Sequence, residues 1–352
     1  MGLRAMILRI SLTLSAMSSI DMCCGFTGFS HCPFALRSGG RLVSSYTHKK
    51  TQLSAARRLN TLSSGVLSLK AEEKFGRGLK AKMKEGHSLV YDYVDGSSPV
   101  IVYLPAFNQS RITSKSSALQ TWAKRNGKAF FSADYYGCGK SDGKFEDGTL
   151  TMWTNDMITL IEDVIKKPVL LVGSGVGGWV GLHLAMKRKN LVPAFPLARF
   201  ATDVSNKVRG LVGIAADPDF TTDVVLPELD DTVKEKIQKD GSAMISWGVS
   251  EYTISKKFID DSKNMLLLPG GSESLDIKCP VRLIQGLSDE EIPPDRALRI
   301  SEAIKSDDVV VYYVKDGDHF LDQDEDISRM IDQVQEMCSK YFEFDLTSPG
   351  SG

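Results

Sequence analysis

Short apolar runs alternate with helical patterns along the chain from residue 71 onward. The runs are too short for helices, are rich in valine, isoleucine and tyrosine, and are bounded by glycine, proline or aspartate, as strands are. Most are apolar throughout, which is typical of strands buried on both faces of a parallel sheet. They are Leu89–Val94, Val100–Leu104, Ala129–Tyr135, Val169–Ser174, Val208–Ala216, Val281–Gly286 and Val309–Lys315.

Helical spacing is clear between and after these runs. In two stretches the apolar residues fall on one face at a period of about 3.6 residues. They are Trp153, Met157, Leu160, Ile161 and Val164 in the first stretch, and Ile327, Met330, Ile331, Val334 and Tyr341 in the second. Strands and helices that alternate in this way predict an α/β fold with a doubly wound, mostly parallel sheet.

Two stretches interrupt the alternation. Residues 217–280 favour helix, most clearly at Val233–Lys239 and Tyr252–Leu268. An insertion between two strands of an open sheet lies over the carboxyl ends of the strands, where such sheets bind ligands. We therefore expect a small helical cap there. Residues 188–207 contain two prolines and predict a loop insertion.

Charged residues are unevenly distributed along the chain. The 352 residues include 43 basic and 44 acidic side chains, a formal net charge of −1. Residues 1–70 hold nine basic side chains and one acidic one, whereas residues 71–352 have a net charge of −9. A basic, serine-rich, acid-poor leader is typical of an organellar transit peptide, and an unstructured extension is the alternative. We expect a mitochondrial protein, with plastid and cytoplasmic locations left open.

The composition excludes several classes of protein. Between the leader and a disordered tail over residues 346–352, we expect one α/β domain over residues 71–345. Its negative charge argues against nucleic acid, whose phosphates require a basic surface. No uncharged apolar run approaches the roughly 18 residues of a membrane span, so we expect none. The six cysteines form no C-x-x-C pair, which supports neither a disulfide framework nor a zinc site. We predict neither a cofactor nor a metal ion.

A glycine-rich turn follows the strand predicted at Val169–Ser174. It consists of Gly173-Ser174-Gly175-Val176-Gly177 and leads into a helix that begins near Val176. This is the setting of the nucleophile elbow of α/β-hydrolases, G-x-S-x-G, in which small residues permit a strained strand-to-helix turn.

Two further loops follow strands in the order that an α/β-hydrolase requires. Asp289 comes directly after one strand and His319 after the last, which gives the order nucleophile, acid, histidine. The loop after an early strand contains Ala106 and Phe107. Either backbone N–H would join that of Val176 in an oxyanion hole, whose donors are each worth roughly 10²–10³ in rate.

Glycine-rich turns of this kind also occur in two classes of nucleotide-binding protein, and the sequence fits both less well. A phosphate-binding P-loop would end in Gly-Lys-Ser/Thr, which is absent. A dinucleotide fingerprint would open the first βαβ unit, with an acidic residue about 20 positions later. Here three strands precede the turn, and residues 186–200 carry no acid, although Gly173, Gly175 and Gly178 satisfy G-x-G-x-x-G. Of the remaining histidines, we expect His183 to pack in the core and His87 to lie at the surface.

The centre of the elbow is a glycine. In G-x-S-x-G the nucleophile is the central residue, and here that position is Gly175. Ser174 precedes the centre, where the side chain faces into the fold, so it is a poor substitute. Without an oxygen or sulfur at Gly175, His319 has nothing to deprotonate.

From about Val100 to Phe342 the chain resembles the mitochondrial palmitoyl-protein thioesterase group of the α/β-hydrolase-domain family. The resemblance implies the α/β-hydrolase fold, a mitochondrial location, and cleavage of S-palmitoyl thioesters and related esters, such as acyl glucuronides, through a Ser-His-Asp triad. It carries Asp289 and His319 over as acid and base. The stretches that carry it are Asp134–Gly143, Leu150–Asp156, Val172–Trp179, Ile254–Asp260 and the loops of Asp289 and His319.

Two positions depart from the pattern of this group. Its nucleophilic serine maps to Gly175, and its Pro-Gly oxyanion loop is Pro105-Ala106 here. In having a glycine at the elbow, the chain resembles the N-myc downstream-regulated family, which is regarded as a non-catalytic branch of the fold. One hypothesis is therefore a thioesterase-like scaffold that binds an acyl or other apolar ligand without triad catalysis. The alternative is an active thioester or carboxylic ester hydrolase that uses Asp289 and His319 with a non-standard nucleophile or an activated water. In either case the partner is a small acyl or ester ligand or an S-acylated protein.

Overall fold

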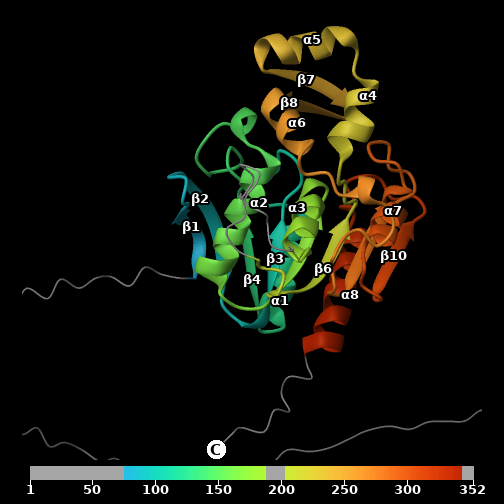
Figure 1. Cartoon of the computed structure of the whole chain (residues 1–352). Coiled ribbons are helices and arrows are strands. Elements are labelled where there is room, and N and C mark those ends of the chain that lie inside the picture. The colour runs from blue at the N-terminus through green and yellow to red at the C-terminus, as the bar shows by residue number, and fades with distance from the viewer. Residues whose placement is uncertain (1–74, 188–202, 343–352) are drawn as a thin grey trace, which may run out of the picture. The chain divides into compact units, whose positions relative to one another are not determined.

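An eight-stranded sheet forms the centre of the computed structural model, which describes residues 75–187 and 203–342. The predicted leader, the predicted tail and most of the predicted loop at 188–207 lie outside these residues. The strands are β1 (Gly76–Lys82), β2 (Ser88–Val94), β3 (Ser97–Leu104), β4 (Lys128–Ala133), β5 (Val169–Ser174), β6 (Val208–Ile214), β9 (Val281–Gly286) and β10 (Val309–Val314). Their order across the sheet is β1-β2-β4-β3-β5-β6-β9-β10 (Figure 1).

The sheet is antiparallel at one edge and parallel elsewhere. β1 pairs with β2, and β2 with β4, in antiparallel register. The pairs from β4 through β3, β5, β6 and β9 to β10 are all parallel. Every residue of β5 and β9 is buried. This agrees with the mostly apolar sequence of β5, whereas β9 also buries the polar side chains of Arg282 and Gln285. The structure confirms the predicted α/β fold.

The edge strand β1 has no counterpart among the predicted strands. Leu79 and Ala81 are half-buried in it, whereas Lys80 and Lys82 are exposed. An edge strand pairs on one side only, and charged residues are typical of it. Its apolar content is therefore too low to mark it as a strand in the sequence.

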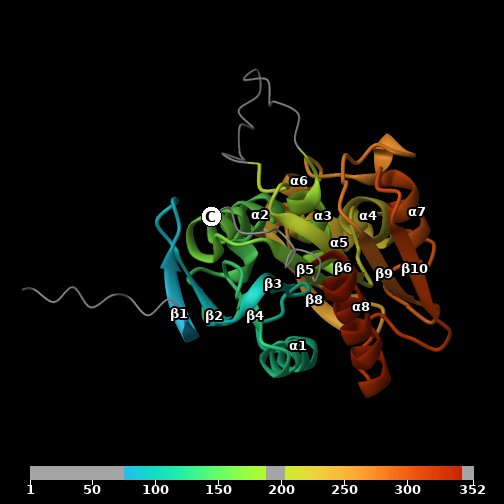
Figure 2. The ribbon, with the colours of Figure 1, turned by 90° about the horizontal axis from the view of Figure 1, so that it is seen from below.

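Helices cover both faces of the sheet. α1 (Ser114–Arg125) and α8 (Asp324–Phe342) lie on one face, and α2 (Leu150–Thr159), α3 (Val176–Ala185) and α7 (Arg296–Ala303) on the other (Figure 2). A π-helix, η2 (Leu160–Ile165), continues α2, and a short 3₁₀ turn, η1 (Phe145–Asp147), precedes it. The buried apolar side chains form two clusters, one beneath each set of helices, so the sheet is doubly wound.

The segment 217–280 forms a cap above the sheet (Figure 1). Its helical parts are η3 (Thr221–Val225), α4 (Leu226–Glu228), α5 (Asp231–Asp240), α6 (Lys256–Ser262) and η4 (Leu268–Gly270). Between α5 and α6 the chain forms an antiparallel hairpin of β7 (Ser242–Trp247) and β8 (Ser250–Ser255).

The hairpin corrects the expectation of a purely helical cap, because Tyr252–Ser255 is strand and not helix. In β7, buried Ala243 and Ile245 alternate with exposed Met244, a period of two that favours a strand. Gly248 opens the turn with φ +52°, a conformation that two-residue hairpin turns require. Within the described residues, no helix is both long and apolar enough to cross a membrane.

Candidate active site

The predicted elbow is present in the structure. β5 ends at Ser174, α3 begins at Val176, and Gly175 alone joins them with φ +52° and ψ −122°. The Gly175 N–H donates to the carbonyl of Ile214 at 2.9 Å. A Cβ on Gly177 would lie 2.1 Å from the carbonyl oxygen of Leu104. The helix can therefore approach β3 this closely only because residue 177 is glycine.

The space beside Gly175 is narrow but open. A Cβ built there would lie 3.3 Å from the Cβ of Ala106 and 3.5 Å from Oδ2 of Asp217. Ser174 borders the same cavity but is 5% exposed. It lies next to Tyr103 of β3, whose pKa is raised to about 12 chiefly by burial.

Asp289 and His319 meet in one hydrogen bond. Asp289 follows β9 and His319 follows β10, and Nδ1 of the imidazole lies 3.0 Å from Oδ2 of the carboxylate. The other oxygen of Asp289 accepts the N–H groups of Glu291 and Ile292, and Gln285 also donates to Oδ2. Burial raises the pKa of Asp289, but the hydrogen bonds from His319 and the backbone outweigh it and hold this pKa below its usual value.

The predicted oxyanion loop lies at the same cavity. Ala106 and Phe107 line it together with Gly175 and His319. Val176 is fully buried as the first residue of α3. The sequence-predicted residues therefore converge on one place between the sheet and the cap, although their roles stay predictions.

This cavity has a volume of about 330 Å³. Its walls come from the strand-end loops below and from the β7–β8 hairpin and η3 region above. Aromatic rings make up much of the lining, namely Phe107, Phe220, Trp247, Tyr252 and Phe320. Phe107 makes edge contacts with both Phe220 and Phe258, at ring-centroid distances of 5.8 Å and 5.0 Å, so one side of the cavity is a packed aromatic cluster.

Three acidic side chains that line the cavity were not predicted, namely Asp217, Glu251 and Glu291. Asp217 follows β6, is 5% exposed, and has its pKa raised to about 7 chiefly by burial. Glu291 accepts a hydrogen bond from the Tyr252 hydroxyl at 2.8 Å and lies 3.6 Å from Nε2 of His319. Asp217 could have been suspected from its place directly after a predicted strand. Glu291 carries no such signal.

These carboxylates change the electrostatics of His319. Burial by itself lowers the pKa of its imidazole, but the hydrogen bond to Asp289 and the charges of Asp289, Glu291 and Asp217 raise it overall. These carboxylates stabilise the protonated imidazole, which is the form that a general base reaches after it takes up a proton.

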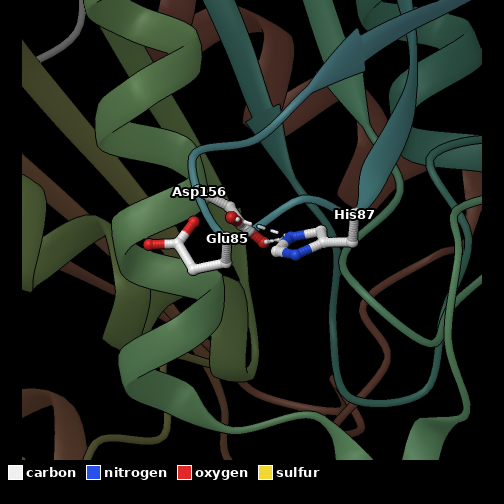
Figure 3. A group of neighbouring side chains, drawn as sticks. All are labelled: Glu85, His87 and Asp156. Atoms are coloured by element: carbon white, nitrogen blue, oxygen red, sulfur yellow. Dashed lines mark hydrogen bonds and ion pairs between the residues drawn. The ribbon is translucent and has the colours of Figure 1, made fainter.

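A second cluster of titratable side chains consists of Glu85, His87 and Asp156 (Figure 3). His87 is not at the surface as expected, since its side chain is 10% exposed and its Nε2 lies 2.9 Å from Oδ2 of the buried Asp156. One imidazole and two carboxylates could bind a divalent metal ion. However, the contact between His87 and Asp156 accounts for the arrangement, and Glu85 is exposed. We assign no metal ion to it, and the expectation of no metal or cofactor stays a prediction.

The strand-to-helix elbow, the Asp289–His319 pair and the doubly wound sheet define an α/β-hydrolase. No protein-family model matches the chain. Among solved structures it is similar to alpha/beta hydrolase domain-containing protein 10 from mouse, with 29% identity, a TM-score of 0.63, and 74% of this chain and 98% of that one covered. A putative hydrolase from Agrobacterium vitis gives 26% identity, a TM-score of 0.64, and coverages of 74% and 97%.

Curated relatives agree with the structural comparison. The Mus musculus protein "Palmitoyl-protein thioesterase ABHD10, mitochondrial" is 32% identical over 257 residues, which cover 72% of this chain and 80% of the relative. The Rattus norvegicus protein of the same name is 29% identical over 266 residues, with coverages of 74% and 82%. The chain belongs to the ABHD10 family.

Proposed function

We propose that this protein binds an acyl, ester or other apolar ligand in the cavity under its cap and does not catalyse hydrolysis through a serine triad. The observation that carries the proposal is Gly175, which occupies the centre of the elbow and offers no hydroxyl to His319. The burial of Ser174, which is 5% exposed, supports it. The names of the relatives suggest that the ligand is a fatty acyl group or an S-acylated protein, and that the protein is mitochondrial.

A serine-directed fluorophosphonate probe tests this proposal. We expect no labelling of the natural protein, because labelling requires a hydroxyl activated by histidine. Gly175→Ser should introduce labelling that His319→Ala abolishes. A triad serine can be worth on the order of 10⁶ in turnover, but crowding against Ala106 should hold the gain below that. The double variant Gly175→Ser/Ala106→Gly should label faster than the single one.

Gly175→Ala is the matched control, because it adds the same Cβ without a hydroxyl. Both substitutions place a side chain at a left-handed φ, which costs on the order of 1–3 kcal/mol, so the two variants should unfold at similar temperatures. Strong labelling of the natural protein that is lost in Ser174→Ala would contradict the proposal and identify Ser174 as the nucleophile.

The alternative function is hydrolysis by an activated water. The intact Asp289–His319 hydrogen bond of 3.0 Å favours it, because this pair orients a base even without a serine. If it holds, the natural protein should hydrolyse a palmitoyl thioester in a direct thiol-release assay, and His319→Ala should reduce the rate by about 10²-fold or more, within the range for general-base catalysis. A rate equal to the uncatalysed one leaves the binding function as the better account.

A further inference from the structure

Asp217 is a buried carboxylate with an unpartnered oxygen among the described residues. It is 5% exposed and lines the cavity beside Gly175. Its Oδ1 has no hydrogen-bond partner among the residues that the structure describes. Its Oδ2 lies 3.5 Å from the point where a Gly175 side chain would begin. A buried polar atom without a partner is costly and uncommon, so this carboxylate is suited to a donor that arrives with a ligand.

His319 and Arg296 act on Asp217 through their charges, which lower its pKa against the larger, raising effect of burial, but no hydrogen bond joins either of them to it. His319 holds Asp289 through Nδ1 and faces Glu291 through Nε2. Arg296 donates to the Pro218 carbonyl and to Asp223. Lys115, at the cavity wall, is surrounded by acidic side chains, namely Asp318, Asp322 and Asp326.

The acidic side chains at the cavity outnumber the basic ones. Asp217, Asp289 and Glu291 surround His319, and exposed Glu251 lines the cavity as well. A carboxylate or phosphate ligand would therefore meet repulsion near Asp217. A cationic ligand would be attracted, more strongly than in water because the site is buried.

The chemical nature of the ligand follows from the groups that line the cavity. Carboxylate oxygens accept N–H groups, and an ammonium offers three of them. The remaining wall is apolar and aromatic, with Phe107, Phe220 and Trp247 among its residues. Aromatic faces also attract a cation within about 6 Å. A ligand that suits both parts carries a compact cationic head and an apolar tail.

We infer that the cavity binds an apolar ligand with a protonated primary amine, whose ammonium group hydrogen-bonds to Asp217 beside Gly175 while its tail lies against the aromatic wall. The inference rests on the proposed binding function. It takes the ligand from the class of other apolar ligands named there, as an alkyl- or arylalkylammonium, in place of an acyl group or ester. Gly175 contributes by its size, since a side chain there would occupy the space next to the Asp217 carboxylate.

Three probes of equal chain length test this inference, namely octylammonium, octanoate and octanol. Their dissociation constants are measured by calorimetry on the full chain at pH 8, where Asp217, with a pKa of about 7, is mostly ionised. We expect octylammonium to bind at least about tenfold more tightly than octanol, as a charge-assisted hydrogen bond permits, and octanoate to bind more weakly than both.

Asp217→Asn should reduce the preference for octylammonium over octanol to less than about twofold, because it keeps the shape and removes the charge. Asp307→Asn, at an exposed position outside the cavity, should leave the preference unchanged. Equal binding of octylammonium and octanol to the natural protein, or a preference that survives Asp217→Asn, overturns the amine inference and leaves the proposed function in place. Binding of none of the three probes overturns both.

Discussion

At the scale of single residues, Gly175 and the buried carboxyl group of Asp217 lie side by side in the cavity. The glycine leaves room beside a carboxylate that no described side chain neutralises through a hydrogen bond. In the folded protein the pKa of Asp217 is about 7, against an ordinary value of 3.8, chiefly because of burial. Between these pH values the folded state binds more protons than the unfolded state, so stability falls as the pH rises through this window.

Asp217→Asn should therefore stabilise the protein more at pH 8 than at pH 5. The asparagine cannot ionise, and the gain at pH 8 should exceed that at pH 5 by about 3 kcal/mol, from about 1.4 kcal/mol for each of the two pH units between pH 5 and the folded pKa of about 7. The free energy of unfolding in urea, measured at both pH values, checks this. Asp307→Asn serves as the exposed control. An equal gain in stability from Asp217→Asn at pH 5 and pH 8 would show that the pKa of Asp217 is not raised in the folded protein.

At the scale of elements, the two ends of the cap are joined by one buried side chain. Asp219 is 2% exposed and accepts the backbone N–H groups of Leu267 and Leu268 at 2.8–3.1 Å. Trp179 and His183 of α3 contact the carbonyl of Met265 in the same returning chain, so His183 packs in the core as predicted. The cap is thus fixed to the elbow helix by polar contacts inside an apolar setting.

Asp219→Ala should lower the free energy of unfolding by about 3 kcal/mol, because it leaves two buried N–H groups without acceptors, each at a cost of about 1–3 kcal/mol. Urea titration followed by tryptophan fluorescence measures the change. Asp307→Ala should change the stability by less than about 0.5 kcal/mol, as exposed substitutions do. A loss of similar size in both variants would mean that Asp219 does not hold the cap.

At the scale of the whole molecule, charge separates two parts of the sequence. Residues 1–70 are basic, and the remaining chain has a net charge of −9. We propose that the basic part is a targeting segment. Residues 1–70 fused to a fluorescent protein should direct it to mitochondria, whereas a fusion with residues 71–352 should stay in the cytosol. A reporter found in plastids, or spread through the cytosol with residues 1–70 attached, would contradict this.

The sequence by itself determined the framework of this protein. Short, mostly apolar runs such as Val169–Ser174 identify buried parallel strands, because they are too short for helices and lack a polar face. The order of Gly175, Asp289 and His319 after successive strands placed them at one edge of the sheet, because the carboxyl ends of parallel strands lie together. The structure then brings Asp289 and His319 into hydrogen-bond contact.

Only the tertiary structure decided the rest, because it depends on contacts between residues far apart in the sequence. Asp217 and Gly175 are 42 positions apart, and their proximity follows from the pairing of β5 with β6. The cap hairpin could not be recognised in the sequence, because the alternation of buried and exposed residues in β7 covers only a few positions. His87 and Asp156, 69 positions apart, are joined across two elements. Periodicity encodes which face of an element is buried, but not which neighbour covers it.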